Sequence, residues 1–400
     1  MTLVNESPQP ALAHGLDGSL VQPDWPALTL AEVRSVLEHF PSAGQAQSIL
    51  STSPRPLSAA AVIETTQGRI FIKRHARAVR DAAGLAEEHR FIDHLRACGI
   101  SVPALFATTS GQTSFESHDW TYEVHELPAG VDLYEDAISW TAFRSAEHAC
   151  SAGAFLARMH LAVECYTAPS RKIQPLVASF TIFASPDPTR AVAEYLAARP
   201  SITHDQQTLS DAAAALDLLA PFHAELHSLN SSLTPLWTHN DLHASNLFWS
   251  DNTANAHAAS VIDFGLADRT NAVYDLAHAI ERNIVEWLVL MNDPGAGDRL
   301  RVHLDHLWAL LDGYEQIRPL NPLESAALAP MLALCHAEFA LSEADYFLGV
   351  LHSPAKARVA THDYLFAHAQ WFASPGQHKL LDPIRLWAES RQQQRESARP

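Results

Sequence analysis

Short β-branched runs and longer amphipathic stretches alternate along the first third of the chain. Residues 59–65 (AAAVIET) and 69–75 (RIFIKRH) are two such runs, and a short turn containing Gly68 joins them. Apolar and β-branched runs on both sides of a glycine turn are typical of a hairpin. This part of the chain is therefore predicted to contain an antiparallel sheet.

A helix is predicted directly after the hairpin. Residues 81–100 carry apolar side chains at helical spacing, and Gly99 stands where such a helix would end. The runs at 102–108 (VPALFAT) and 120–127 (WTYEVHEL) predict two more strands. The first region is thus expected to be a small antiparallel sheet with one main helix.

The pattern changes after Pro128, where the chain becomes mostly helical. Long Ala- and Leu-rich stretches predict helices, two polar loops are flanked by short apolar strands, and the remainder reads as helical almost to the end. The prediction is an α+β chain of two lobes. It divides into a flexible tail (1–25), a nucleotide-binding lobe of sheet plus helix (26–127) and a helical lobe (128–400).

The composition of the chain limits the classes of binding partner that are expected. The chain has 400 residues and a formal net charge of −18, which argues against nucleic acid or an anionic membrane as the main partner and fits a small molecule. The four cysteines form no C-x-x-C pair, as expected of free thiols in a reducing compartment. The N-terminus lacks a signal-peptide pattern, and no apolar run of about 18 residues is evident. A cytoplasmic location is expected.

Residues 239–246 (HNDLHASN) pose the main chemical question. His239 and His243 have the i, i+4 spacing of zinc ligands on a helix, but no third ligand follows at a metal-site spacing. Asp241 and Asn246 instead have the spacing of a phosphoryl-transfer loop, and Asp263 begins a DFG triplet downstream. With a strand lysine and a helix glutamate upstream, this order favours a kinase-like phosphotransferase over a zinc site.

Each residue type has a physical role in that chemistry. A strand lysine (Lys73) offers a compact cation to the nucleotide phosphates, and a helix glutamate, Glu88 or its neighbour Glu87, would hold it. The oxygens of Asn246 and Asp263 suit Mg²⁺, which prefers oxygen ligands. Asp241 would orient the acceptor hydroxyl and accept its proton, and His239 would support the loop.

The motifs HNDLHASNLFW, VIDFGLAD and YDLA resemble the aminoglycoside phosphotransferase and choline kinase superfamily, nearest to the branch of homoserine kinase type II, hydroxylysine kinase and stress-response kinases. The resemblance implies a bilobal protein-kinase-like fold that binds ATP and Mg²⁺. Carried over to this chain, it implies a catalytic residue (Asp241), metal ligands (Asn246 and Asp263), an ion pair (Lys73 and Glu88), a structural brace (Asp275) and a hinge for adenine (Glu126 and Leu127).

The chain departs from the protein-kinase pattern in two ways, and it also suggests an acceptor site. The chain lacks the glycine-rich motif before Lys73 and the arginine that many protein kinases carry in the catalytic loop. Glu281, Glu338 and Asp345 are expected to form an acid-lined acceptor pocket, although they could equally be solvated or pair with Arg282. The predicted function is ATP- and Mg²⁺-dependent phosphorylation of a hydroxyl on a small, amine-bearing molecule. A stress-response protein kinase and a silent kinase-like binding protein are the alternatives.

Overall fold

The computed structural model describes residues 13–14, 20–138 and 140–397, so most of the predicted flexible tail lies outside the described residues. The described chain forms two compact units. Of the described residues, those up to His89 and Pro103–Leu127 form the sheet unit, and Arg90–Val102 with those from Pro128 onward form the helical unit. The sheet unit contains β1 (Ala13–His14), β2 (Leu20–Val21), α1 (Leu30–Leu37), η1 (Pro41–Ala43), β3 (Ala46–Thr52), β4 (Ala59–Thr65), β5 (Gly68–Ala76), the first half of α2 (Ala82–Ala97), β6 (Ser114–Ser117) and β7 (Trp120–Glu126).

The sheet unit is built on a five-stranded antiparallel sheet in the order β3-β4-β5-β7-β6. The predicted hairpin is confirmed as β4 and β5, and Gly68 in its turn has a φ of 114°. The strand predicted at 102–108 is wrong. That segment forms only an isolated bridge between Leu105 and His125, because β6 already pairs with residues 120–123 on this edge of β7 and leaves only 124–126 open to it.

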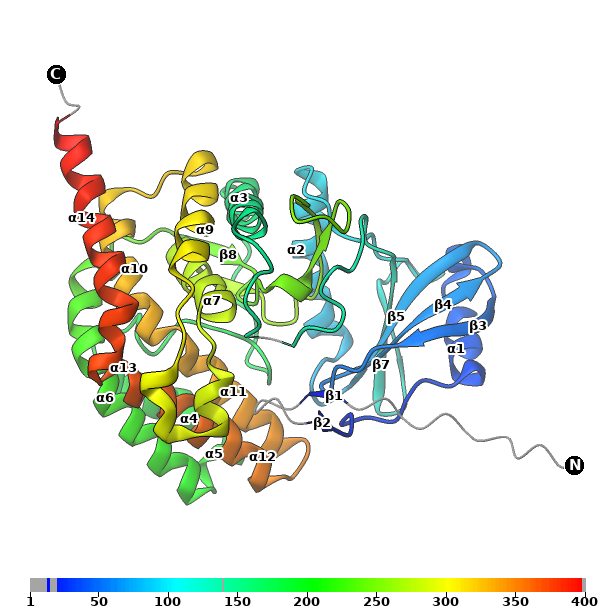
Figure 1. Ribbon diagram of the computed structural model, residues 1–400. Helices are drawn as coiled ribbons and strands as arrows, with labels where there is room; N and C mark the ends of the chain where they lie inside the picture. Colours follow the sequence, from blue (N-terminus) through cyan, green and yellow to red (C-terminus); the bar gives the residue numbers. More distant parts are fainter. Residues whose placement is uncertain (1–12, 15–19, 139, 398–400) are drawn as a thin grey trace, which may run out of the picture. The chain divides into compact units, whose positions relative to one another are not determined.

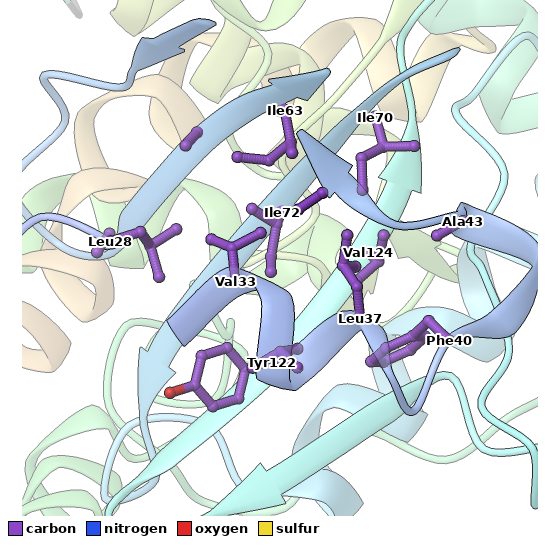
Figure 2. Close-up of a cluster of buried hydrophobic side chains, with 14 residues drawn as sticks. Leu28, Val33, Leu37, Phe40, Ala43, Ile63, Ile70, Ile72, Tyr122 and Val124 are labelled. Carbon is purple, nitrogen blue, oxygen red and sulfur yellow. The ribbon is translucent and has the colours of Figure 1, made fainter. Parts of the chain in front are cut away.

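Alternation along β5 and β7 gives the sheet two chemically different faces. Ile70 and Ile72 of β5 and Val124 of β7 are buried against α1 in the hydrophobic core of this unit. Figure 2 shows Val33 and Leu37 of α1 among these strand side chains. Successive side chains on a strand point to opposite faces, so the residues between them face away from α1.

The helix predicted at 81–100 is confirmed as α2, and Gly99 follows its end with a φ of 83°. Sequence patterns missed α1, although Thr29 and Glu32 form a capping box at its start. Strands β3 and β6 were missed as well.

The helical unit confirms the predicted change of pattern after Pro128. It contains α3 (Ala146–Ala162), α4 (Pro188–Ala197), α5 (Pro200–Thr203), α6 (Gln206–Asn230), β8 (Pro235–Thr238), η2 (Ala244–Asn246), β9 (Leu247–Trp249), β10 (Ala258–Val261), β11 (Asp268–Asn271), α7 (Ala272–Ile284), α8 (Leu288–Asn292), η3 (Pro294–Arg299), α9 (Leu304–Ile317), α10 (Pro322–Leu334), α11 (His336–Gly349), α12 (Pro354–Arg358), η4 (Val359–Phe366), α13 (Ala367–Phe372), η5 (Pro375–Lys379) and α14 (Leu381–Ser397).

Two glycines let α3 and α9 run side by side at very close range (Figure 1). A Cβ atom on Gly153 of α3 would lie 2.0 Å from the carbonyl oxygen of Leu310, and one on Gly313 of α9 would lie 1.9 Å from that of Cys150. Neither distance is possible for a real side chain, so this contact requires glycine at both positions.

One stretch of the helical unit is apolar enough to cross a membrane by length and composition. Within the described residues it lies in Pro322–Gly349, where α10 and α11 follow one another, and an 18-residue window of this stretch has a mean hydropathy of 1.3. The sequence prediction overlooked it because polar residues such as His336 and Glu338 interrupt the apolar ones. Since 94% of this window is buried inside the protein, the stretch is part of the interior of the unit.

Candidate active site

A single buried carboxylate holds the loop that contains Asp241. Asp275 lies in the first turn of α7, whose N-terminus is capped by Asn271. Its Oδ2 accepts the backbone N–H of His239 at 2.9 Å, and its Oδ1 accepts that of Asn240 at 2.8 Å. The α7 helix therefore positions the residue immediately before Asp241.

Asp275 is itself supported from α3. His160 places Nε2 3.0 Å from Oδ2 of Asp275, and its Nδ1 lies 2.7 Å from the hydroxyl of Tyr314. Burial alone raises the pKa of a carboxyl, but the hydrogen bond and charge of His160 and the loop N–H groups hold the pKa of Asp275 below its ordinary value. Asp275 is thus kept ionised as an acceptor for the loop.

His239 and His243 are positioned as loop supports. Nε2 of His239 lies 3.0 Å from the carbonyl of Ile262, and its Nδ1 accepts the N–H of Asp241. Nδ1 of His243 lies 2.9 Å from the hydroxyl of Ser245. Both ring nitrogens of His239 contact backbone groups, and among the described residues His239 and His243 belong to no cluster of three potential metal ligands, which argues against the zinc interpretation of this pair.

Asn240 bends the chain at the centre of the loop. Its φ is 61°, in the left-handed region that asparagine tolerates better than most residues. Its side-chain amide donates to the carbonyls of Ala178 and Leu266. These hydrogen bonds fix the loop to two segments that are distant in the sequence, directly before Asp241.

A short strand pair brings Asn246 and Asp263 to the same end. Asn246 precedes β9 directly, and β9 pairs with β10, so that the carbonyl of Asn246 accepts the N–H of Ile262 at 3.0 Å. Asp263 is the next residue; it is exposed and has a φ of 62°. The amide nitrogen of Asn246 donates to the backbone carbonyl of Asp241 at 2.9 Å, which leaves the amide oxygen as the end of Asn246 that a cation can use.

Arg171 organises the segment after Asp263, and sequence patterns gave no signal for it. Its guanidinium donates to the carbonyls of Gly265 and Ala267 at 3.1 and 3.3 Å. The backbone N–H of Arg171 donates to the carboxylate of Asp268. An isolated arginine in a loop has no recognisable pattern, so only the structure identifies this contact.

A buried arginine lies beside Asp241. Nε of Arg282 is 3.3 Å from Oδ1 of Asp241 and 3.5 Å from Oε2 of Glu281, although neither contact has hydrogen-bond geometry. The guanidinium is stacked between Trp140 and Phe339, at 4.5 and 4.7 Å from the two ring centroids. Arg282 is only 2% exposed, and among the described residues its Nη2 finds no hydrogen-bond partner.

Two carboxyls complete this buried polar cluster. Burial raises the pKa of Glu281 and raises that of Glu343 to about 8, while Arg282 opposes both shifts. Oε1 of Glu281 accepts Nε1–H of Trp140 at 2.9 Å, whereas Oε2 of Glu343 has no hydrogen-bond partner within the described parts of the chain. Glu343 was missed because its helix, α11, carries acidic residues on more than one face.

The other two acidic residues expected at the acceptor site serve the packing of α11. Glu338 accepts hydrogen bonds from the backbone of Thr181 and Ile182 and from the hydroxyl of Ser179. Asp345 accepts one from the hydroxyl of Ser201. Since these carboxylates are engaged with the segment 179–201, this face of α11 differs from the expected acid-lined pocket.

The remaining candidates lie in the sheet unit. Lys73 is half-buried on β5, and Glu88 is buried on α2 while Glu87 is half-buried. The charges of both Lys73 and Glu88 act on His75, whose pKa is lowered chiefly by burial. Glu126 ends β7, where its N–H donates to the carbonyl of Ala104, and Leu127 follows it and is exposed.

Comparison with known proteins adds independent information. The model of the "Phosphotransferase enzyme family" matches residues 58–320. A homoserine kinase of Janthinobacterium sp. (strain Marseille) is 28% identical over 272 residues, which cover 68% of this chain and 71% of that protein.

Solved structures agree on the fold. A microcompartment-associated aminopropanol kinase has a TM-score of 0.55 at 16% identity, covering 90% of this chain and 99% of its own. The amicoumacin kinase hAmiN, in complex with AMP-PNP, Ca²⁺ and amicoumacin, has a TM-score of 0.53 at 16% identity, covering 86% and 96%. These likenesses confirm the predicted kinase-like fold.

Proposed function

The chain belongs to the phosphotransferase enzyme family, and from this premise we propose that it transfers the γ-phosphoryl group of ATP, in the presence of Mg²⁺, to a hydroxyl of a small amine-bearing molecule. The observation that supports the proposal is that Asp275 fixes the backbone of His239 and Asn240 directly before Asp241, whose carboxylate lies near the amide of Asn246 and the guanidinium of Arg282. Phosphoryl transfer depends mainly on positioning and charge neutralisation, which such an arrangement can supply.

Asn246 and Asp263 would hold Mg²⁺. Both offer oxygen atoms, as this hard cation requires, and the β9–β10 pair holds their backbones at one end of a strand pair. When bound, the metal would neutralise phosphate charge. Asp241 would orient the acceptor hydroxyl and take its proton at a carboxylate oxygen.

In the sheet unit, Lys73 would bind the nucleotide phosphates and Glu88 would hold Lys73 in place. Glu88 is preferred to Glu87 because it is buried and because its charge, like that of Lys73, acts on His75. The chain around Glu126 and Leu127 would meet the adenine through its backbone. The N–H of Glu126 already donates to the carbonyl of Ala104, so we assign the adenine contact to the other backbone groups of these two residues.

The acceptor's amine is inferred from the cluster around Arg282. Glu281 and Glu343 both resist ionisation because burial is only partly offset by one arginine. An ammonium group placed beside them would stabilise their ionised forms, and Trp140 presents an aromatic ring to the same cluster. Amine-bearing acceptors therefore gain binding energy here that neutral alcohols do not.

Arg282 favours an acceptor that also carries a carboxylate. A buried guanidinium with an unused donor, Nη2, costs free energy until an anionic oxygen meets it. Among amine-bearing alcohols, the hydroxy-amino acids supply such a group. The compounds named for two similar proteins differ in this respect, because homoserine has a carboxylate and aminopropanol does not.

The test is ADP release by the purified protein with Mg·ATP across hydroxy-amino acids, amino-alcohols, sugars and aminoglycosides, with Asp241→Asn as the blank. We expect amine-bearing acceptors to stimulate ADP release by the wild-type protein. In Asp241→Asn the stimulated rate should be at least about 100-fold lower while nucleotide binding is retained. Asp263→Ala should instead weaken Mg·ATP binding. Silence across the panel with intact nucleotide binding would contradict a small amine-bearing acceptor and favour a protein substrate.

A further inference from the structure

Three histidines converge on one buried carboxylate in the sheet unit. Nε2 of His75 lies 2.9 Å from Oε1 of Glu123, while Nε2 of His89 and of His125 lie 2.7 and 3.0 Å from Oε2. Glu123 is 1% exposed, and the side chain of His125 is 14% exposed. The proposed function uses none of these four side chains.

Strand alternation explains why they meet. Glu123 and His125 lie two residues apart on β7, and His75 lies diagonally across on β5, so all three occupy the face of the sheet that turns away from α1. His89 reaches the same point from α2, directly after the buried Glu88. The arrangement is therefore set by three elements and not by a mobile loop.

The ligand atoms of His89, Glu123 and His125 all lie within 4.8 Å of one another. Two imidazole nitrogens and one carboxylate oxygen are a ligand set that zinc and similar dications prefer. Tetrahedral bonds of about 2.0–2.1 Å place ligand atoms about 3.3 Å apart. The two nitrogen–oxygen distances of 2.7 and 3.0 Å would therefore open by a few tenths of an ångström, and the separation of the two ring nitrogens, which is within 4.8 Å, would adjust to the same value.

The surrounding contacts suit a metal as well. Nδ1 of His89 lies 2.7 Å from the hydroxyl of Thr113, and Oε1 of Glu123 is held by His75. Metal-binding histidines usually donate their second ring N–H to such a partner, which fixes the ring and the tautomer. On metal binding, the proton of His89 would move from Nε2 to Nδ1 and be donated to Thr113, whose hydroxyl only has to rotate.

We propose that His89, Glu123 and His125 form a binding site for a transition-metal dication of the zinc class, with a fourth position open to water. The ligands differ from the oxygen pair proposed for Mg²⁺. Because Lys73 lies directly opposite Glu123 in the strand pair, an occupied site would place a dication beside the lysine assigned to the phosphates.

The test is titration of the chelator-treated, full-length protein with Co²⁺, followed by displacement with Zn²⁺. One Co²⁺ per chain with the visible absorption of a tetrahedral site is expected. His125→Gln, at the most exposed ligand, should weaken binding at least about 100-fold, since even second-layer changes cost 10–100-fold. Thr113→Val should weaken it about tenfold, and His227→Gln, an exposed histidine on α6, should leave it unchanged.

A competing thiol site can be separated in the same experiment. Cys98 and Cys165 both have Sγ within 4 Å of Nε2 of His94, at 3.6 and 3.9 Å, and both are exposed. Cys98→Ser should therefore leave the tetrahedral signal intact. Loss of the signal in Cys98→Ser but not in His125→Gln would overturn the proposal, as would the absence of Co²⁺ and Zn²⁺ binding to the folded wild-type chain.

Discussion

Nε of Arg282 lies 3.3 Å from Oδ1 of Asp241, so a buried guanidinium adjoins the proposed catalytic carboxylate. The guanidinium lies against the rings of Trp140 and Phe339, and the residue is almost fully buried. One donor, Nη2, has no partner in the described parts of the chain. In the proposed function, this contact would link acceptor binding at Arg282 to the position of Asp241, the group proposed to receive the proton of the acceptor.

Arg282→Lys should change which acceptor is preferred. Lysine keeps the positive charge but loses the planar fork and the stacking between two rings. We expect the ratio of kcat/KM for L-homoserine to that for 3-amino-1-propanol to fall about 10–100-fold, the range for a lost hydrogen bond to a charged group. These two compounds differ only in the carboxylate, so any general damage at Asp241 cancels in the ratio.

The control for this measurement is Arg190→Lys, at an exposed arginine of α4 that pairs with Glu194. It should leave the ratio unchanged. If Arg282→Lys lowers kcat/KM for both compounds equally, then Arg282 acts on Asp241 alone and does not recognise the acceptor's carboxylate.

Asp275→Asn should impair both stability and turnover. The carboxylate accepts three hydrogen bonds, from His239, Asn240 and His160, and an amide would turn a donor toward one of these donors. We expect the free energy of unfolding to fall by about 1–3 kcal/mol, the cost of an unsatisfied buried group, and kcat to fall more than KM rises. Denaturant unfolding and steady-state kinetics measure the two effects, with Asp217→Asn on the exposed face of α6 as the control.

The fold and the order of the site motifs follow from local sequence, since hydrophobic periodicity and contiguous motifs need no tertiary information. Asp241 and Asn246 share one short loop, so their spacing alone predicts that they lie together. Glu343 could not be found in this way. On α11, Glu343 lies on a different face from Glu338 and Asp345, and only packing shows that Glu343 is the one whose ionisation responds to Asp241 and Arg282.

The other contacts that the sequence did not predict join residues that are far apart in the chain. Trp140 and Arg282 are 142 positions apart, and Arg171 reaches carbonyls more than 90 residues away. Periodicity indicates which residues share a helix face but not which face meets which neighbour. The predicted strand at 102–108 failed for a related reason, because an apolar run cannot show that β6 already occupies most of this edge of β7.

Gly313→Ala should destabilise the helical unit. An added Cβ would lie 1.9 Å from the carbonyl oxygen of Cys150, and since both partners are backbone atoms the helices α3 and α9 must separate. Overpacking of this kind typically costs 1–3 kcal/mol, which exceeds the roughly 1 kcal/mol that alanine gains over glycine in a helix. Thermal and denaturant unfolding would measure the loss. Gln316→Ala, exposed on the same helix, should stay within about 0.5 kcal/mol of wild type.

Glu343→Gln should alter how stability depends on pH. The pKa of Glu343 is raised to about 8 in the folded protein, mainly by burial, so between about pH 4.5 and 8 the folded chain holds a proton that the unfolded chain releases. The free energy of unfolding therefore falls as pH rises through this window, by an amount on the order of a few kcal/mol. Glutamine cannot ionise, so the variant should lack this part of the decline.

Denaturant unfolding of both proteins from pH 5 to 9 tests this, because all other titrating groups are shared and cancel in the difference. The difference between variant and wild type should grow with pH and level off above about pH 8. Glu389→Gln, an exposed position on α14, provides the matched control and should give a flat difference. A flat difference for Glu343→Gln as well would mean that Glu343 ionises normally. The ammonium group of the acceptor would then lose one of the two carboxyls proposed to bind it.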